Sequence, residues 1–225
     1  MDYYPLWNSL RIAGISTLII LIIGVAAAHM VTHLSRWVKG IIDCIFTLPL
    51  VLPPTVIGYL LLRMLGPKRF IGKAFLSVFG IKLTMNWWSA IFATSVIIFP
   101  LMYRTARSAF EAFDKNLDWA GKSLGLSRSY IFFRVKLPCC KQGIIAGCVL
   151  SFARALGEYG ATSMIAGYIP GRTATISTTV YQLWRTGKDD LVTKWVLINI
   201  AISAFVLIAI NMFEDRNKRS QYSRA

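Results

Sequence analysis

Residues 11–36 read RIAGISTLIILIIGVAAAHMVTHLSR, and the 24 residues between Arg11 and Arg36 include no Asp, Glu, Lys or Arg. An α-helix rises about 1.5 Å per residue, so about 20 apolar residues cross the ~30 Å hydrocarbon core of a bilayer. The stretch is therefore long enough to span a membrane. It is longer than the apolar part of a signal peptide and no basic segment precedes it, so we interpret it as a retained membrane helix.

Four more stretches of this kind follow along the chain. Uncharged runs of 19, 21 and 19 residues lie between Asp43 and Arg63, between Lys82 and Arg104, and between Lys194 and Glu214. A run of 30 residues between Lys141 and Arg172 contains two charges, Arg154 and Glu158. We therefore predict an all-α integral membrane protein, residues 1–225 forming a single transmembrane domain. The five spans are expected at residues 11–32, 40–63, 86–106, 142–166 and 193–213.

The composition excludes a soluble globular domain and a disordered chain. Hydrophobic residues make up 56% and charged residues 16% of the 225 residues, and the mean hydropathy is +0.56. Soluble domains carry about a quarter charged residues, and disordered chains lack large aliphatic side chains. The net charge of +15 would suggest nucleic-acid binding in a soluble protein. Here the basic residues lie between apolar runs, so membrane topology explains them and no nucleic-acid partner is expected.

The distribution of basic residues predicts the orientation in the membrane. If the N-terminus is outside, the inner segments 33–39, 104–141 and 214–225 hold fourteen Lys and Arg, and the outer loops 64–85 and 167–194 hold eight. Cytoplasmic loops are enriched in these residues. We expect a multi-pass protein of the cytoplasmic membrane with its N-terminus outside and its C-terminus in the cytoplasm. The outer run TATISTT, residues 173–179, either lines a vestibule or is a solvated loop.

The inner segment 107–138 has the pattern of two short helices. Asp114 is a candidate N-cap, Gly125 stands where a left-handed residue ends a helix, and Ser127 can cap the next one. Pro138 prevents that second helix from continuing unchanged. Leu117, Ala120 and Leu124 recur at helical spacing and give the first helix an apolar face. Such a face either lies on lipid or fits a groove on a cytosolic partner.

The same segment resembles the EAA loop of ABC-importer permeases, which reads E-A-A, three residues, Gly, nine residues, Ile, one residue, Leu-Pro. Gly125, Leu137 and Pro138 match, Val135 replaces Ile, and Ala120 fits the first alanine. The chain departs from the pattern where Trp119, preceded by Asp118, takes the glutamate position and where Gly121 replaces the second alanine. The resemblance implies a coupling helix that sits in a cleft of a separate ATPase. The coupling residues implied are Leu117, Asp118, Trp119, Ala120, Gly121, Leu124, Gly125, Val135, Leu137 and Pro138.

Three further stretches resemble molybdate permeases in particular. They are LPLVLPPTVIGYL at 48–60, the region from Phe70 to Met102, and FARALGEYGAT at 152–162 followed by IPGRT at 169–173. Sulfate permeases carry a close relative of the last motif, but the short chain with five spans favours the molybdate type. Tungstate is a tetrahedral dianion of nearly the same size and is not distinguished. A sulfate or thiosulfate permease is the alternative.

The resemblance also implies an assembly. Two copies of the permease, a cytoplasmic ABC ATPase dimer and an extracytoplasmic molybdate-binding protein are expected, in a lipid bilayer. A homodimer also follows from size, because five spans are too few to enclose a gated path and closed two-fold dimers are the commonest assembly. We expect no cofactor bound by this chain, with ATP and Mg²⁺ used by the ATPase.

Two places within the spans are candidates for the translocation path or its gate. Pro53 and Pro54 free backbone carbonyls inside the second span, which marks either a static kink or a bend that faces the path. Arg154 and Glu158 lie four residues apart on the expected fourth span, as either a structural ion pair or a charged element of the path. Gly157 and Gly160 beside them are expected to permit close approach of another helix.

Other classes of protein lack support in the sequence. No P-loop, GxSxG or HExxH motif is present, so neither a membrane enzyme nor a chain that hydrolyses ATP itself is indicated. A secondary transporter or channel would usually show more spans or an internal repeat. His29 and His33 have no third ligand in the sequence pattern, and the four cysteines have no CxxC spacing, so we expect no metal site. Asp43 is expected to cap or pack rather than to perform chemistry.

Overall fold

The computed structural model describes the backbone of residues 2–222 and the side chains of that range except 79, 207 and 209–222. In this described part the secondary structure is entirely helical, as predicted. The helices are α1 (Tyr4–Thr32), α2 (Arg36–Val51), α3 (Pro54–Leu65), α4 (Phe70–Phe79), α5 (Trp87–Glu111), α6 (Lys115–Ser123), α7 (Arg128–Ile131), the π-helical η1 (Phe132–Lys136), α8 (Leu137–Cys139), α9 (Lys141–Leu156), α10 (Gly160–Ile165), α11 (Ile176–Arg185) and α12 (Asp189–Tyr222).

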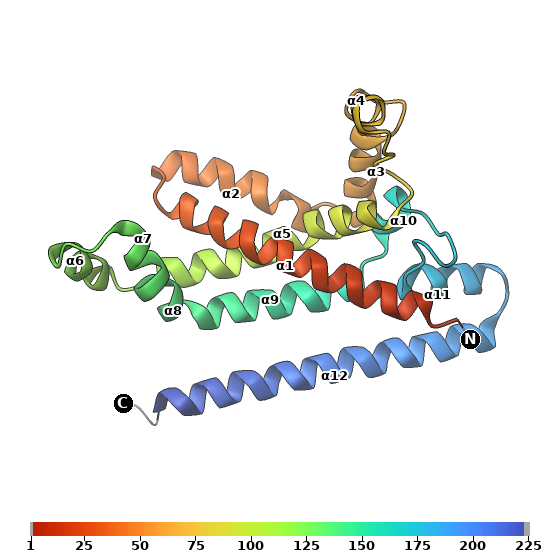
Figure 1. Cartoon of the computed structure of the whole chain (residues 1–225). Helices are drawn as coiled ribbons and strands as arrows, with labels where there is room; N and C mark the ends of the chain where they lie inside the picture. The colour runs from red at the N-terminus through yellow and green to blue at the C-terminus, as the bar shows by residue number, and fades with distance from the viewer. Residues whose placement is uncertain (1, 223–225) are drawn as a thin grey trace.

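Three long helices, α1, α5 and α9, pack side by side and form the core (Figure 1). Small residues let them approach closely: a side chain at Gly24 of α1 would meet Met102 of α5 at 3.0 Å, and one at Gly143 of α9 would meet Ala109 of α5 at 2.6 Å. Tyr103 and Ile98 of α5 are fully buried between them. Close packing of small residues is the usual basis of helix association in membranes, where no hydrophobic force draws helices together.

Two of the predicted spans are broken rather than continuous. α2 and α3 meet at an angle of 109°, because Pro53 and Pro54 supply no backbone donor and Leu52 and Pro53 are extended. The predicted span 142–166 is also divided, into α9 and the short α10, with Gly157 ending α9. The sequence indicated a kink or bend at Pro53 and Pro54 but did not indicate the break after Leu156.

Among the described residues, α1 and α5 are single helices that are long and apolar enough to cross a membrane. The bent pair α2–α3 meets the same criterion when its two helices are taken together. So does the pair formed by residues 128–139 and α9, which meet at an angle of 69°. The predicted span 193–213 lies in α12, and its side chains from residue 209 onward are outside the described set. The predicted limits of the five spans therefore stay predictions.

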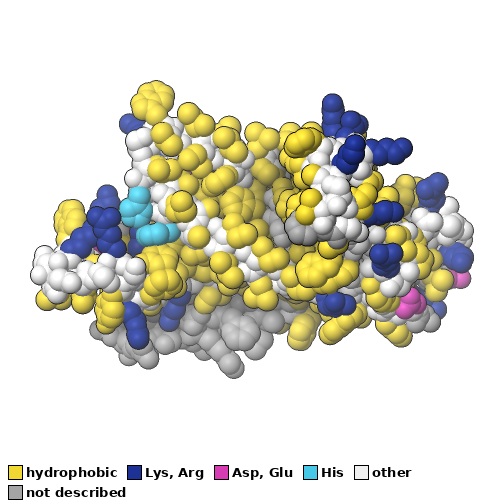
Figure 2. All heavy atoms as spheres, turned by 45° about the horizontal axis from the view of Figure 1, so that its top comes forward, with side chains coloured by type: hydrophobic (Ala, Val, Ile, Leu, Met, Phe, Trp, Pro, Cys, Tyr) yellow, Lys and Arg dark blue, Asp and Glu magenta, His cyan; other side chains and the backbone are white. Residues whose placement is uncertain are grey.

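The two ends of the molecule are different in character. The short helices α6, α7 and α8 form one end, and α4, α10 and α11 lie at the other, where α1 begins (Figure 1). α12 runs from the α11 end toward the α6 end. Figure 2 shows apolar side chains over the middle of one face, with Lys and Arg gathered at both ends. An apolar band between two charged ends is the surface expected of a membrane protein.

The hydroxyl-rich run 173–179 is not a solvated loop. Thr173, Thr175, Thr178 and Thr179 are buried, and Thr175 and Thr178 form a capping box at the start of α11. The beginning of α1 is tied to the same region: the Asn8 amide donates to the carbonyl of residue 174 at 2.9 Å, and the hydroxyl of Ser9 accepts from the N–H of residue 176 at 2.9 Å. Asn8 and Ser9 thus hold the start of α11 against α1.

Candidate functional site

The segment between α5 and α9 is built from local caps, as the sequence predicts. Asp114 accepts a hydrogen bond from the N–H of Asn116 at 2.9 Å and begins α6. Gly125 has φ of +73° and ends it. Ser127 then accepts from the N–H of Tyr130 at 3.2 Å and begins α7. These three predictions are confirmed, because capping depends on residues that are close in the chain.

α6 presents an apolar face that nothing in the described part of the chain covers. Leu117, Trp119 and Leu124 are 45%, 61% and 78% exposed, and Ala120 is exposed beside them. Asp118 forms an ion pair with Lys122 one turn later. α6 is held at Gly121, which lies against Ile131 of α7, where a side chain would meet it at 3.0 Å. The helix is therefore packed against α7 at this point, while its apolar side chains Leu117 and Trp119 stay exposed.

The second half of the segment is anchored in the core instead. Leu137 and Phe132 pack against the core, Val135 is half-buried, and Lys136 Nζ lies 5.2 Å from the ring centre of Phe110 in α5. Burial lowers the pKa of Lys136. Pro138 is expected to prevent the second helix from continuing unchanged. The helix does change, to a π turn at Phe132–Lys136 before the proline, and it ends at Cys139, just after it. η1 and α8 thus connect the exposed α6 firmly to α9.

A cluster of charged side chains joins α2 to α5 at the same end of the molecule. Asp43 accepts a hydrogen bond from the Tyr103 hydroxyl and pairs with Arg107. Glu111 pairs with Lys39 and lies 3.1 Å from the Nε atom of Arg107. The hydrogen bond from Lys39 holds the pKa of Glu111 below its ordinary value. Asp43 thus has the packing role expected, but from the interior of α2 rather than as a cap.

Arg154 and Glu158 meet, although not on one helix. α9 ends at Leu156, and Glu158 lies beyond that end. Arg154 Nη1 lies 2.8 Å from Glu158 Oε2, and the other carboxylate oxygen accepts from the N–H of Ala161 at 2.9 Å. The Glu158 side chain is 1% exposed, whereas that of Arg154 is 38% exposed. Glu158 therefore holds the start of α10 and orients Arg154, whose guanidinium is open to the surface.

α3 and α10 make contact at the level of the backbone. A side chain at Gly160 would meet Pro54 at 2.9 Å, and one at Gly58 would meet the Cα atom of Ala161 at 2.7 Å. Gly160 therefore permits the close approach predicted for it, and the bend at Pro53 and Pro54 is packed against α10. At Gly157, where α9 ends, nothing in the described part of this chain lies within 4 Å of a side chain placed there. The close approach predicted for Gly157 stays a prediction.

Sequence reasoning singled out neither Gly58 as a packing residue nor the pair formed by Lys39 and Glu111. Their partners lie far away in the chain, on α10 and α5. A glycine within an apolar run was the available signal for Gly58, since glycine in a membrane helix often marks a close contact. In the described residues, no three His, Cys, Asp or Glu side chains gather in a way that could hold a metal ion.

Comparison with known proteins places these features in a family. A family model described as binding-protein-dependent transport system inner membrane component matches residues 20–218. The molybdenum transport system permease protein ModB of Escherichia coli (strain K12) is 39% identical, with 98% of each chain covered. A probable sulfate transport system permease protein, cysT, of Chlorokybus atmophyticus is 31% identical over 93% of this chain and 73% of its own.

A solved structure shows the same fold. A chain of a bacterial alginate ABC transporter, solved in complex with an alginate-bound periplasmic protein, superposes with a TM-score of 0.76. The match covers 95% of this chain and 78% of that one, at 20% identity. The bent helices and the short helices at one end therefore belong to an architecture that ABC importers use.

Proposed function

Because this chain belongs to the family of binding-protein-dependent transport system inner membrane components, we propose that it is the permease subunit of an ATP-driven importer of molybdate or tungstate. The observation that carries the proposal is the 39% identity to a molybdenum transport permease over 98% of both chains. The sulfate relative is less similar, at 31%, and this chain covers 73% of its length. The chain moves the anion and hydrolyses nothing itself.

The exposed face of α6 is proposed as the docking surface for the ATPase. Leu117, Trp119, Ala120 and Leu124 offer an apolar ridge outside the membrane, and an apolar face of this kind is stabilised by a groove on a partner. The ATPase would bind ATP and Mg²⁺, and its movement would reach the membrane through η1 and α8, which Leu137 ties to the core. The left-handed Gly125 keeps α6 and α7 close together.

Two copies of the permease, related by a two-fold axis, would enclose the path, and an extracytoplasmic binding protein would deliver the anion. The alginate importer supports the last partner, since it was solved with a periplasmic protein bound. The orientation proposed is N-terminus outside and C-terminus inside. The excess of Lys and Arg in the inner segments supports it, as does α12, which runs toward the α6 end (Figure 1).

Arg154 is the residue proposed to meet the anion. Charged side chains in membrane segments are costly and usually serve a path or a partner. Glu158 neutralises one side of the Arg154 guanidinium. The Arg154 side chain is partly exposed, so its remaining N–H groups can donate hydrogen bonds to a dianion. Gly160 follows Glu158 by two residues and packs against Pro54, so the bend at Pro53 and Pro54 would form part of the gate.

Uptake by the reconstituted complex tests the proposal. Proteoliposomes that contain the permease, its ATPase and binding protein should accumulate labelled molybdate when ATP is enclosed with the ATPase. Unlabelled tungstate should compete, and sulfate at the same concentration should not. Preferential uptake of sulfate or thiosulfate would show that the alternative oxyanion class is correct.

Cysteine labelling tests the orientation. The outer label is best placed at Thr186, which is exposed just after α11. Residues within α11, such as the half-buried Ser177, are less accessible to a reagent. Thr186→Cys should react with an impermeant maleimide in intact cells, and Asn116→Cys should react after permeabilisation alone. The reverse pattern would contradict both the orientation and the role of α6.

A further inference from the structure

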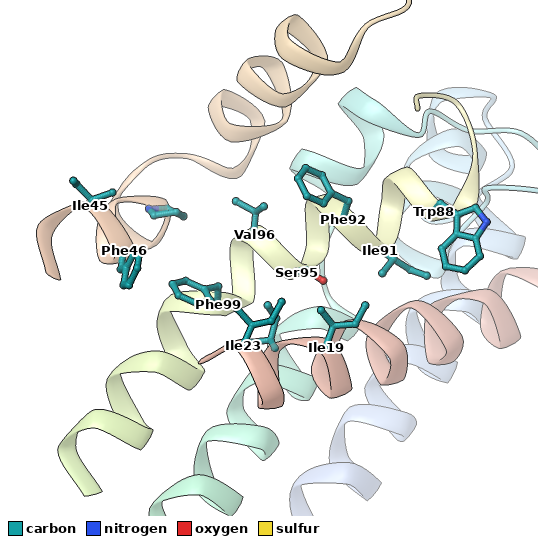
Figure 3. A pocket seen from close by; sticks show the side chains of 12 residues that line it. Ile19, Ile23, Ile45, Phe46, Trp88, Ile91, Phe92, Ser95, Val96 and Phe99 are labelled. Atoms are coloured by element: carbon teal, nitrogen blue, oxygen red, sulfur yellow. The ribbon is translucent and has the colours of Figure 1, made fainter. Parts of the chain in front are cut away.

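An apolar groove runs between α1, α2 and α5, and none of the site residues described above is part of its lining (Figure 3). Its volume is about 470 Å³. Ile19 and Ile23 of α1, Phe46 of α2, and Trp88 and Phe99 of α5 point into it (Figure 3). Ser95 is the one polar side chain of the lining. The groove is open on one side, because Trp88, Phe92, Ile23 and Ile45 on its rim are exposed.

The length of the groove equals about one leaflet of the bilayer. Along α5 the lining begins at Trp88 and ends at Phe99, eleven residues later. At about 1.5 Å per residue this is roughly 16 Å, which is half of the ~30 Å hydrocarbon core. In the orientation proposed above, on which the assignment of the leaflet rests, the groove extends from the outer surface to the middle of the membrane.

The outer end of the groove carries a cation that lies over an aromatic ring. Arg11 Cζ lies 4.9 Å from the ring centre of Trp87, which stacks on Trp88 at 4.1 Å. Trp88 belongs to the groove lining. Arg11 is exposed and has no carboxylate partner among the residues that the structure describes. It precedes Ile19 and Ile23 on α1 by eight and twelve residues, which is about two and three helical turns toward the outer end.

We propose that this groove binds one acyl chain of an anionic phospholipid of the outer leaflet, with the phosphate at Arg11. Tryptophans at the level of the headgroups and a cation for the phosphate match such a lipid in position and in charge. A helix of a second copy is the other possible occupant, and it would not explain the cation at the outer end of the groove.

Counting retained lipid tests the proposal without a transport assay. The complex is purified in detergent, stripped of lipid, and offered phosphatidylglycerol or phosphatidylcholine at equal concentration, and native mass spectrometry counts the lipid per permease. Phosphatidylglycerol should be retained about fivefold better, since one basic residue near a membrane surface contributes about 1 kcal/mol toward an anionic lipid. Arg11→Gln should remove that preference. Lys68→Gln, which removes an exposed charge between α3 and α4, should keep it.

Filling the groove separates the acyl chain from the headgroup. Ile23→Trp should lower the retention of both lipids, whereas Leu18→Trp, on α1 but outside the lining, should not. Equal retention of the two lipids in wild type and in Arg11→Gln would overturn the proposal. So would efficient cross-linking of Ile23→Cys between two permease copies, because the groove would then be a subunit interface. A substrate other than molybdate would affect neither result, so failure of the proposed function and failure of this site can be told apart.

Discussion

The exposed face of α6 and the contact between α3 and α10 lie toward opposite ends of the molecule and are built in opposite ways (Figure 1). α6 is held by caps at Asp114 and Gly125 and leaves Leu124 78% exposed. At the other contact, Gly58 and Gly160 bring two backbones so close that a side chain at Gly58 would lie 2.7 Å from a Cα atom. The first region leaves apolar side chains exposed to solvent, whereas the second has no space for a side chain larger than glycine.

This difference indicates where a substitution should act. A change on the free face of α6 removes contacts with another chain, so the permease itself should fold and insert as before. A change at the α3–α10 contact displaces backbone within the chain, where packing is close and strain is not relieved by solvent. Glycine is required in both regions, but for conformation at Gly125 and for space at Gly58.

The largest effect is expected from Gly58→Val. Its side chain would meet Ala161 and Met164 at less than 3 Å, and overpacking of this kind costs about 3 kcal/mol. Thermal unfolding of the purified protein in detergent should begin markedly lower, or the protein should fail to accumulate. Gly157→Ala is the control, because open space surrounds that residue, and its stability should match that of the wild type. Equal stability of both variants would show that α3 and α10 are not packed as described.

Gly125→Val should leave the fold intact and remove coupling. At φ of +73° a β-branched residue costs about 1–2 kcal/mol, and the chain relieves this by moving α6 relative to α7. The variant should insert and unfold like the wild type, but lose transport-coupled ATP hydrolysis. Gly125→Asn should keep most of the activity, since asparagine tolerates the left-handed conformation. Normal coupling in Gly125→Val would mean that the position of α6 is unimportant.

Arg154→Gln should reduce uptake at low molybdate by about tenfold, because a hydrogen bond to a charged group contributes about 1.5 kcal/mol or more. The substitution also leaves Glu158 buried without its cation, which is destabilising by itself. The double variant Arg154→Gln with Glu158→Gln removes that effect and retains an acceptor for Ala161. Uptake that recovers fully in the double variant would assign the pair a structural role alone.

The smallest effect is expected at the charged cluster that joins α2 to α5. Glu111 is 41% exposed, and pairs of this kind contribute about 1 kcal/mol or less. The pKa of Glu111 is lower in the folded than in the unfolded state. Ionised Glu111 therefore adds to the free energy of unfolding above the unfolded pKa, and this stabilisation is lost as the pH falls through the folded pKa. Glu111→Gln should therefore be slightly less stable than wild type at neutral pH and equally stable in acid. A difference that grows on acidification would contradict this assignment.

The sequence predicted those parts of the structure that depend on neighbouring residues. The caps at Asp114 and Ser127 and the turn at Gly125 follow from short-range hydrogen bonds and backbone conformation. The ion pair of Arg154 and Glu158 was foreseen for the same reason, because four residues separate them.

Long-range features were beyond the sequence. The prolines mark the bend between α2 and α3, but the contact of α3 with α10, more than 100 residues later, is not visible in the sequence. The burial of residues 173–179 depends on α1, whose Asn8 and Ser9 bind that segment. Hydropathy indicates that a run is apolar, but not which neighbour it meets.

Co-purification of the ATPase with Leu124→Asp tests the central claim, that the free face of α6 is the coupling surface. Leu124 makes few contacts within the chain, so a charge there should act on the partner alone. Val78→Asp is the control, because Val78 on α4 is 72% exposed at the opposite end. The account predicts that the ATPase elutes with wild type and Val78→Asp but not with Leu124→Asp, which remains folded. Normal binding of the ATPase to Leu124→Asp, with normal uptake of molybdate, would contradict it.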